Sequence, residues 1–170
     1  DEVCEYLINS YGLDMDNAAK FYLFDRDNKS NTDKRMIQHY LNILTEPYGD
    51  DTDCEKGGLL LLSYPAVECF VLSNFIEDTY KHEFDLGKDV KHFIAQPENQ
   101  KQIQFNKIDK DTLLFAVNEF LKYIEYIGLE MNLDTIFELN KNIYINEEDN
   151  YLQKGTYMAF SELVLSLLYL

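Results

Sequence analysis

Asp25 and Asp27 are the residues of this sequence best suited to do chemistry. They follow the apolar run 21–24 and stand one residue apart, so both carboxylates lie at the end of one predicted strand. Two carboxylates this close repel each other unless a cation or a donor is present, and hard divalent ions such as Mg²⁺ bind oxygen ligands of this kind. The pair therefore predicts a metal site, while the alternative is an Asp-rich turn that caps the next helix.

Glu68 is the second acidic candidate. It lies one helical turn after the apolar run 59–62, among residues that have a buried pattern, and a buried charge needs a partner. If the two apolar runs are adjacent parallel strands, their carboxyl ends meet and Glu68 approaches the two aspartates. The alternative is an ion pair of Glu68 with Arg26, Lys29 or Arg35.

Lys29 and Arg26 are the basic residues beside the aspartates. Either can contact a scissile phosphate, and either can simply balance the charge of its acidic neighbours. Ser63 suits a helix cap or a hydroxyl that contacts a ligand, and the acidic stretch 50–55 suits a weak cation site or a solvated loop. The candidate catalytic residues are therefore Glu68 and Lys29, and the candidate metal ligands are Asp25, Asp27 and Glu68.

Alternating strands and helices are expected to position these residues. The runs 20–24 and 59–63 are short, apolar and bounded by polar residues or glycine, which indicates buried strands. Helices are predicted at 2–11, after a cap at Asn31 or Thr32, and from Pro65 to 76. A strand, helix, strand, helix order gives a right-handed parallel crossover. We therefore expect an α/β fold in which residues 1–76 form a small parallel sheet with flanking helices.

The remaining chain, 77–170, is predicted to be a polar connector followed by a mainly helical part that packs on the same core. The apolar spacing predicts helices near 88–95, over 112–127 with a cap at Asp111, over 133–140 and over 157–170. The last helix is so apolar that it must pack on the sheet or on a partner. A homo-oligomer formed through this C-terminal helix is therefore one expectation.

The chain is strongly acidic. It has 31 acidic and 15 basic residues among 170, a net charge of -16, and no basic segment. This counts against autonomous nucleic-acid binding and against an anionic membrane surface, so contact with nucleic acid would need the full-length protein or a basic partner. The three cysteines have no CxxC spacing and the three histidines no zinc-site spacing, which predicts free thiols and no zinc. Without a signal peptide or a membrane-length apolar run, we expect a cytoplasmic protein.

Two short motifs within residues 20–76 carry a family resemblance. They are Leu23-Phe24-Asp25-Arg26-Asp27 and Ser63-Tyr64-Pro65-Ala66-Val67-Glu68. Together they resemble the Toprim domains of RloB-like and overcoming-lysogenization-defect nucleases. The resemblance implies a parallel α/β sheet, Mg²⁺ at Asp25 and Asp27, Glu68 as a further acidic ligand or base, and metal-assisted phosphodiester hydrolysis.

The resemblance also implies an acidic residue that these motifs lack. Toprim chemistry uses a further Glu at the end of an earlier strand, and residues 1–19 contain no such motif. Because the sequence starts at Asp1 rather than Met, we expect a fragment without that strand or a degenerate relative. Nuclease activity is then expected only of the full-length protein.

Two other function classes remain open. In a haloacid-dehalogenase-like phosphotransferase Asp25 would be the nucleophile and Asp27 the acid, although Asn28 and Lys29 stand where that family has a small residue and then Thr or Val. A non-enzymatic interaction module, for example in a phage-defence or regulatory assembly, is favoured by the acidic charge and the apolar C-terminal segment.

Overall fold

The computed structural model describes residues 2–12, 18–29, 32–48 and 57–169. Its core is a small sheet in which β3 (Gly58–Tyr64) is the central strand. β1 (Phe21–Asp25) pairs with β3 in parallel, whereas β2 (Thr45–Glu46) and β6 (Phe160–Ser161) pair with it in antiparallel. The α/β class is therefore as expected, but the sheet is mixed rather than parallel, because two short segments predicted as something else complete it.

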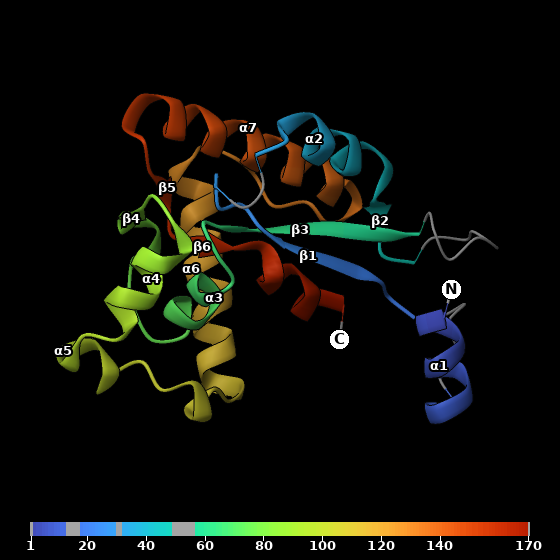
Figure 1. Cartoon of the computed structure of the whole chain (residues 1–170), viewed down its shortest axis with the longest axis horizontal. Helices are drawn as coiled ribbons and strands as arrows, with labels where there is room; N and C mark the ends of the chain where they lie inside the picture. Colours follow the sequence, from blue (N-terminus) through green and yellow to red (C-terminus); the bar gives the residue numbers. More distant parts are fainter. Residues whose placement is uncertain (1, 13–17, 30–31, 49–56, 170) are drawn as a thin grey trace.

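The sequence of β3 explains its central place. All seven of its residues are buried, and Leu59 to Leu62 form an apolar run without alternation, as a strand covered on both faces requires. Figure 1 shows α2 (Lys34–Ile43) and α7 (Ile136–Lys154) above the sheet, with α3 (Glu68–Ser73), α6 (Lys110–Tyr126) and the C-terminal η4 (Glu162–Tyr169) below it. The two layers of helices together cover both faces.

Helices begin and end at positions that differ from those the sequence predicts. α2 is capped by Asp33, whose side chain accepts hydrogen bonds from two backbone N–H groups of the first turn, and not by Thr32; Asn31 lies outside the described residues. α6 is capped by Asp109 rather than Asp111. The helix predicted at 133–140 is α7, which follows η3 (Leu133–Thr135) and runs to Lys154. The sequence did not reveal its length because two of its acidic residues, Glu147 and Glu148, are buried, which breaks the amphipathic pattern.

The connector contains more structure than predicted. It holds η1 (Thr79–Lys81), β4 (Glu83–Phe84), α4 (Gly87–Ile94), α5 (Pro97–Gln100) and η2 (Phe105–Lys107). Of these, α4 matches the helix predicted near 88–95. β4 pairs in antiparallel with β5 (Tyr157–Met158), which ties the connector to the C-terminal segment.

The helix predicted over 157–170 is right only in part, because residues 162–169 form a 3-10 helix and residues 157–158 and 160–161 form strands instead. This segment forms β5, then β6, then the 3-10 turns of η4, and residues 157–162 are all buried. Its backbone hydrogen bonds are made with β4 and β3, which a local periodicity does not reveal. Because most of its described apolar side chains are at least partly buried within the chain, the predicted homo-oligomer contact is left without support.

The helix predicted at 2–11 is confirmed as α1 (Glu2–Tyr11), which lies apart from the other elements in Figure 1. Among the described residues, no helix combines the length and the hydropathy that crossing a membrane requires.

Candidate functional site

Asp25 and Asp27 lie at the carboxyl end of β1, beside an open pocket of about 480 Å³. The pocket is lined by Leu23, Phe24, Asp25, Asp27, Ala66, Val67, Gly87, Lys88 and Lys91. Three segments that are distant in sequence meet there: the end of β1, the turn after β3 and the start of α4. This is the edge at which open α/β sheets usually bind ligands.

The register of the two parallel strands places Asp25. Asp25 stands opposite Ser63, so the turn after β3 passes beside its carboxylate, and the Val67 N–H donates a hydrogen bond of 2.7 Å to Asp25 Oδ1. Partial burial raises the pKa of Asp25 above its usual value, and the charges of Glu68 and Asp27 raise it further, while the Val67 N–H and Lys91 act in the opposite direction. Burial and two acidic neighbours thus disfavour the ionised form of Asp25, while one N–H donor and one lysine favour it.

Backbone donors from two directions hold Asp27. The Lys29 N–H donates to Oδ1 at 2.8 Å, and the Gly87 N–H donates to Oδ2 at 3.1 Å. Gly87 is the first residue of α4, and a Cβ there would lie 2.9 Å from the Cβ of Ala66, closer than two carbons can pack. The absence of a side chain at Gly87 therefore lets α4 approach the aspartates.

Glu68 does not line this pocket, but it follows Val67 in sequence and its charge raises the pKa of Asp25. Its ion-pair partner is Lys91, with 3.2 Å between Lys91 Nζ and Glu68 Oε1, and not one of the bases expected near the aspartates. Within the described part of the chain, Glu68 Oε2 is buried and has no hydrogen-bond partner. A buried carboxylate oxygen in this situation favours a cation nearby.

Arg26 points away from the pocket. It is fully buried, its Nε lies 2.7 Å from Glu148 Oε1, and its guanidinium lies 6.0 and 5.7 Å from the rings of Tyr144 and Tyr157. Lys34 completes this group, with its Nζ 2.6 Å from Glu148 Oε2. A phosphate in the pocket does not reach a residue buried in this way, so Arg26 anchors the loop rather than contacting a ligand.

The structure also places the other predicted residues. Lys29 is exposed and does not line the pocket, while the lysines that do, Lys88 and Lys91, were not singled out in the sequence. Ser63 is buried and its Oγ lies 2.6 Å from Ser161 Oγ, so it joins β3 to β6 instead of facing a ligand. The acidic stretch 50–55 lies outside the described residues.

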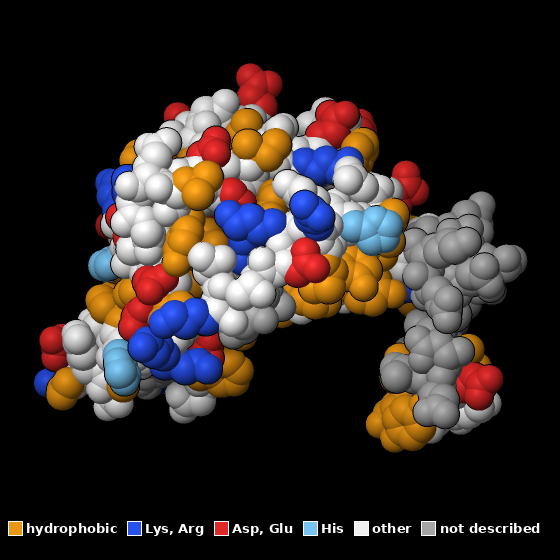
Figure 2. Space-filling model, turned by 45° about the horizontal axis from the view of Figure 1, so that its top comes forward, with side chains coloured by type: hydrophobic (Ala, Val, Ile, Leu, Met, Phe, Trp, Pro, Cys, Tyr) orange, Lys and Arg blue, Asp and Glu red, His pale blue; other side chains and the backbone are white. Residues whose placement is uncertain are grey.

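Figure 2 shows Lys and Arg side chains gathered in two places on one face, over α4 and over the beginning of α2. Lys88 and Lys91 belong to the first place, and Arg35 is an exposed member of the second. On a chain with a net charge of -16, these are local exceptions to the acidic surface. α2 follows residues 25–29 in sequence, and α4 contacts them through the hydrogen bond from the Gly87 N–H to Asp27.

A divalent cation fits the residues of this site. No group of three or more His, Cys, Asp or Glu side chains in residues 2–12, 18–29, 32–48 and 57–169 is arranged to hold a metal ion. Mg²⁺, however, is commonly held by one or two carboxylates, with substrate phosphates and water as the other ligands. Asp25 and Asp27 supply oxygens of that type.

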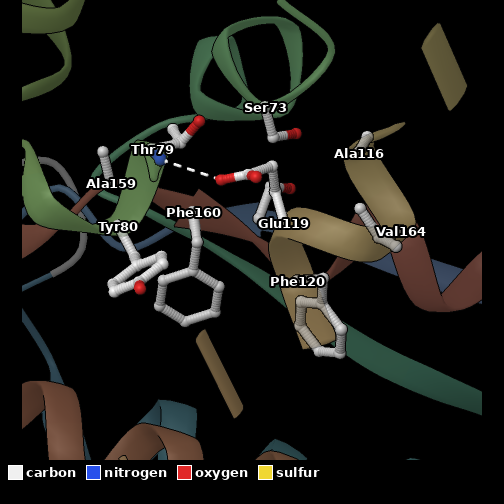
Figure 3. Close-up of a pocket in the computed structure, with 10 residues that line it drawn as sticks. Ser73, Thr79, Tyr80, Ala116, Glu119, Phe120, Ala159, Phe160 and Val164 are labelled. Carbon is white, nitrogen blue, oxygen red and sulfur yellow. Dashed lines mark hydrogen bonds between the residues drawn. The ribbon is translucent and has the colours of Figure 1, made fainter. Parts of the chain in front are cut away.

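A second cavity is too small to be a substrate site. It lies between α3, η1, α6 and β6, and its volume of about 10 Å³ has room for about one water molecule. In Figure 3 the carboxylate of Glu119 points toward Thr79, whose N–H donates to Glu119 Oε2 at 3.1 Å. Lys122 Nζ lies 2.7 Å from Glu119 Oε1, so the acid is paired and joins α6 to η1.

The pocket at the end of β1 is therefore the candidate site on structural grounds. The resemblance to Toprim domains remains a prediction that rests on sequence motifs. Comparisons of the chain with protein families, with curated proteins and with solved structures find no match.

Proposed function

We propose that this chain carries the acidic centre of a site for divalent-cation-dependent hydrolysis of a phosphodiester in nucleic acid. One observation carries the proposal: Asp25 and Asp27 share an open pocket with Lys88 and Lys91 at the carboxyl end of parallel strands. Carboxylates alone would repel a phosphate, and lysines alone would not hold Mg²⁺. Both kinds of charge in one pocket suit a metal ion and a phosphate together.

The acidic and basic residues of this site would have separate roles in the reaction. The N–H groups of Val67 and Gly87 orient the two aspartates, whose carboxylates would hold the cation. Glu68 accepts a proton from the attacking water, and the lysines of α4 bind the negative phosphate. A bound Mg²⁺ supplies a Lewis acid and lowers the pKa of water. Contact with a long nucleic acid would rely on the full-length protein or on a basic partner, because this chain is acidic overall.

A metal titration tests this proposal. We expect Mg²⁺ or Mn²⁺, added to the chain and followed by calorimetry and by NMR, to bind to the wild type but not to the double variant Asp25→Asn/Asp27→Asn. Asp111→Asn, an exposed aspartate of α6, is the matched control and should bind as the wild type does. Absence of binding, or equal binding by wild type and double variant, would show that the proposal is wrong.

The two other function classes stay as predictions. Phosphotransfer with Asp25 as the nucleophile would be indicated by hydrolysis of a small aryl phosphate that Asp25→Asn abolishes. A non-enzymatic interaction role would be indicated by self-association of the chain or by folding that depends on a partner.

A further inference from the structure

Lys91 holds an unusual place in the pocket, because its charge acts on the acidic residues that would bind a metal ion. Its Nζ lies 3.2 Å from Glu68 Oε1, and its charge lowers the pKa of Asp25. Its side chain is 64% exposed, whereas that of Glu68 is 26% exposed. An ion pair with one partner in solvent contributes little to stability, so Lys91 can leave Glu68 at small cost.

A divalent cation at this site would compete with Lys91. The cation would lie at Asp25 and Asp27, where the charge of Lys91 already acts on Asp25, and two positive groups close together repel each other. Once the cation neutralises the carboxylates, it repels the ammonium of Lys91 and weakens the attraction that holds Lys91 beside Glu68. It remains in the same pocket, on a flexible stem and with three donors that suit a phosphate oxygen.

Lys88 extends this positive wall of the pocket. It precedes Lys91 by three positions in α4, so the two side chains lie on neighbouring parts of one helix face, and both line the pocket. The hydrogen bond from the Gly87 N–H to Asp27 fixes the start of this helix against the aspartates. The lysines are therefore held at the pocket by the same contact that orients one of the carboxylates.

We propose that Lys91 exchanges partners during binding: it pairs with Glu68 until a divalent cation occupies the carboxylates, and then, together with Lys88, it contacts a non-bridging oxygen of the substrate phosphate. This inference rests on the proposed function and adds to it. It assigns the anion-binding role to Lys88 and Lys91 of α4, and not to Lys29, which the sequence suggested.

The exchange predicts opposite effects of one substitution on two ligands. In Lys91→Met the competitor of the cation is gone, so Mn²⁺ alone should bind up to about fivefold more tightly, as for loss of an exposed ion pair. A short fluorescein-labelled single-stranded DNA, titrated in the presence of Ca²⁺, should bind about tenfold more weakly because a charged contact to phosphate is lost. A lysine with a merely structural role would weaken both.

Three further variants sharpen the test. Lys88→Met should weaken DNA binding and leave the Mn²⁺ affinity unchanged, because Lys88 has no ion pair with Glu68 among the described contacts. Lys91→Arg should retain both affinities to within about twofold, since it keeps the charge. Lys107→Met, an exposed lysine of η2, should change neither affinity and is the matched control.

Each outcome bears on a separate statement. The Mn²⁺ titration of the wild type reports on the proposed function alone, and no binding would overturn both proposals. If the wild type binds Mn²⁺ while Lys91→Met binds it equally or more weakly, the exchange is wrong and the proposed function stands. If Lys91→Met binds DNA as the wild type does, or if a wild type that binds Mn²⁺ binds no DNA, the phosphate contact of Lys91 is wrong.

Discussion

At the end of β1, acidic and basic side chains point in opposite directions. Asp25 and Asp27 face the pocket, whereas Arg26 between them points into the protein, as the alternation of side chains along an extended chain requires. The buried guanidinium is compensated by Glu148 and by two tyrosine rings. Arg26 therefore holds the aspartates in place from behind, without contacting the ligand.

Removing Glu148 as a partner of Arg26 should be costly. Glu148→Gln would remove a carboxylate charge that pairs with the fully buried guanidinium, and we expect the free energy of unfolding to fall by about 3–5 kcal/mol. Urea denaturation measures this loss. Glu138→Gln, an exposed glutamate of the same helix α7, should change it by less than about 0.5 kcal/mol. Similar stability of the two variants would show that Arg26 does not depend on Glu148.

At the scale of elements, the site depends on how closely α4 approaches the turn after β3. Gly87 begins α4, donates its N–H to Asp27 and lies against Ala66. Local helix propensity favours Ala over Gly by up to about 1 kcal/mol in a helix interior, whereas steric overlap in a packed region costs about 1–3 kcal/mol. At this position the overlap should decide the outcome.

Gly87→Ala should therefore displace α4. We expect a loss of about 1–3 kcal/mol in the free energy of unfolding, together with weaker Mn²⁺ binding, because the new Cβ would meet Ala66 Cβ at 2.9 Å. Denaturation and calorimetry measure the two effects. The double variant Gly87→Ala/Ala66→Gly removes the overlapping carbon and should recover the Mn²⁺ affinity. A single variant that binds Mn²⁺ normally would contradict this account of the glycine.

At the scale of the whole molecule, two buried acids join the C-terminal segment to the rest of the fold. Glu147 accepts hydrogen bonds from the Tyr123 hydroxyl at 2.9 Å and the Met158 N–H at 3.0 Å, and Glu162 accepts one from the Leu62 N–H at 2.7 Å. Burial raises the pKa of Glu147 to about 8, and it also raises the pKa of Glu162 well above its usual value. Burial therefore disfavours the ionised form of both acids in the folded chain.

The sign of the resulting pH dependence follows from proton uptake. Because the pKa of Glu147 is about 8 in the folded chain and 4.5 as a reference, the folded state binds more protons between these values, and stability falls as pH rises through that window. The slope for one proton is at most about 1.4 kcal/mol per pH unit. Repulsion among the other carboxylates acts in the same direction, so a variant is needed to isolate Glu147.

Glu147→Gln keeps the shape and neutral charge of the protonated acid. We expect the free energy of unfolding of the wild type to decrease between about pH 5 and pH 8, and that of Glu147→Gln to decrease less steeply. Denaturant titrations at several pH values measure the slopes, and the exposed Glu138→Gln should retain the wild-type slope. Equal slopes for the wild type and Glu147→Gln would mean that Glu147 is ionised in the folded chain.

The sequence by itself determined the features that depend on local pattern. The two apolar runs predicted β1 and the central β3, and the 3.6-residue spacing predicted α6. The D-x-D motif lies at a strand end, with Glu68 nearby. A continuous apolar run or an apolar stripe with helical spacing predicts a buried strand or helix face, because the residues concerned are neighbours in sequence or one turn apart. These features needed no knowledge of distant segments.

Only the tertiary structure decided which distant residues meet. Lys91 reaches Glu68 because α4 docks on the turn after β3, and Arg26 finds its partner in α7, 122 residues later in the chain. The segment 157–170 is apolar enough for a helix, yet β5 and β6 form because β4 and β3 offer backbone partners there. Hydrogen bonds and ion pairs between distant segments produce no periodic pattern in the sequence. The place of Lys88 and Lys91 in this pocket is therefore visible only in the fold.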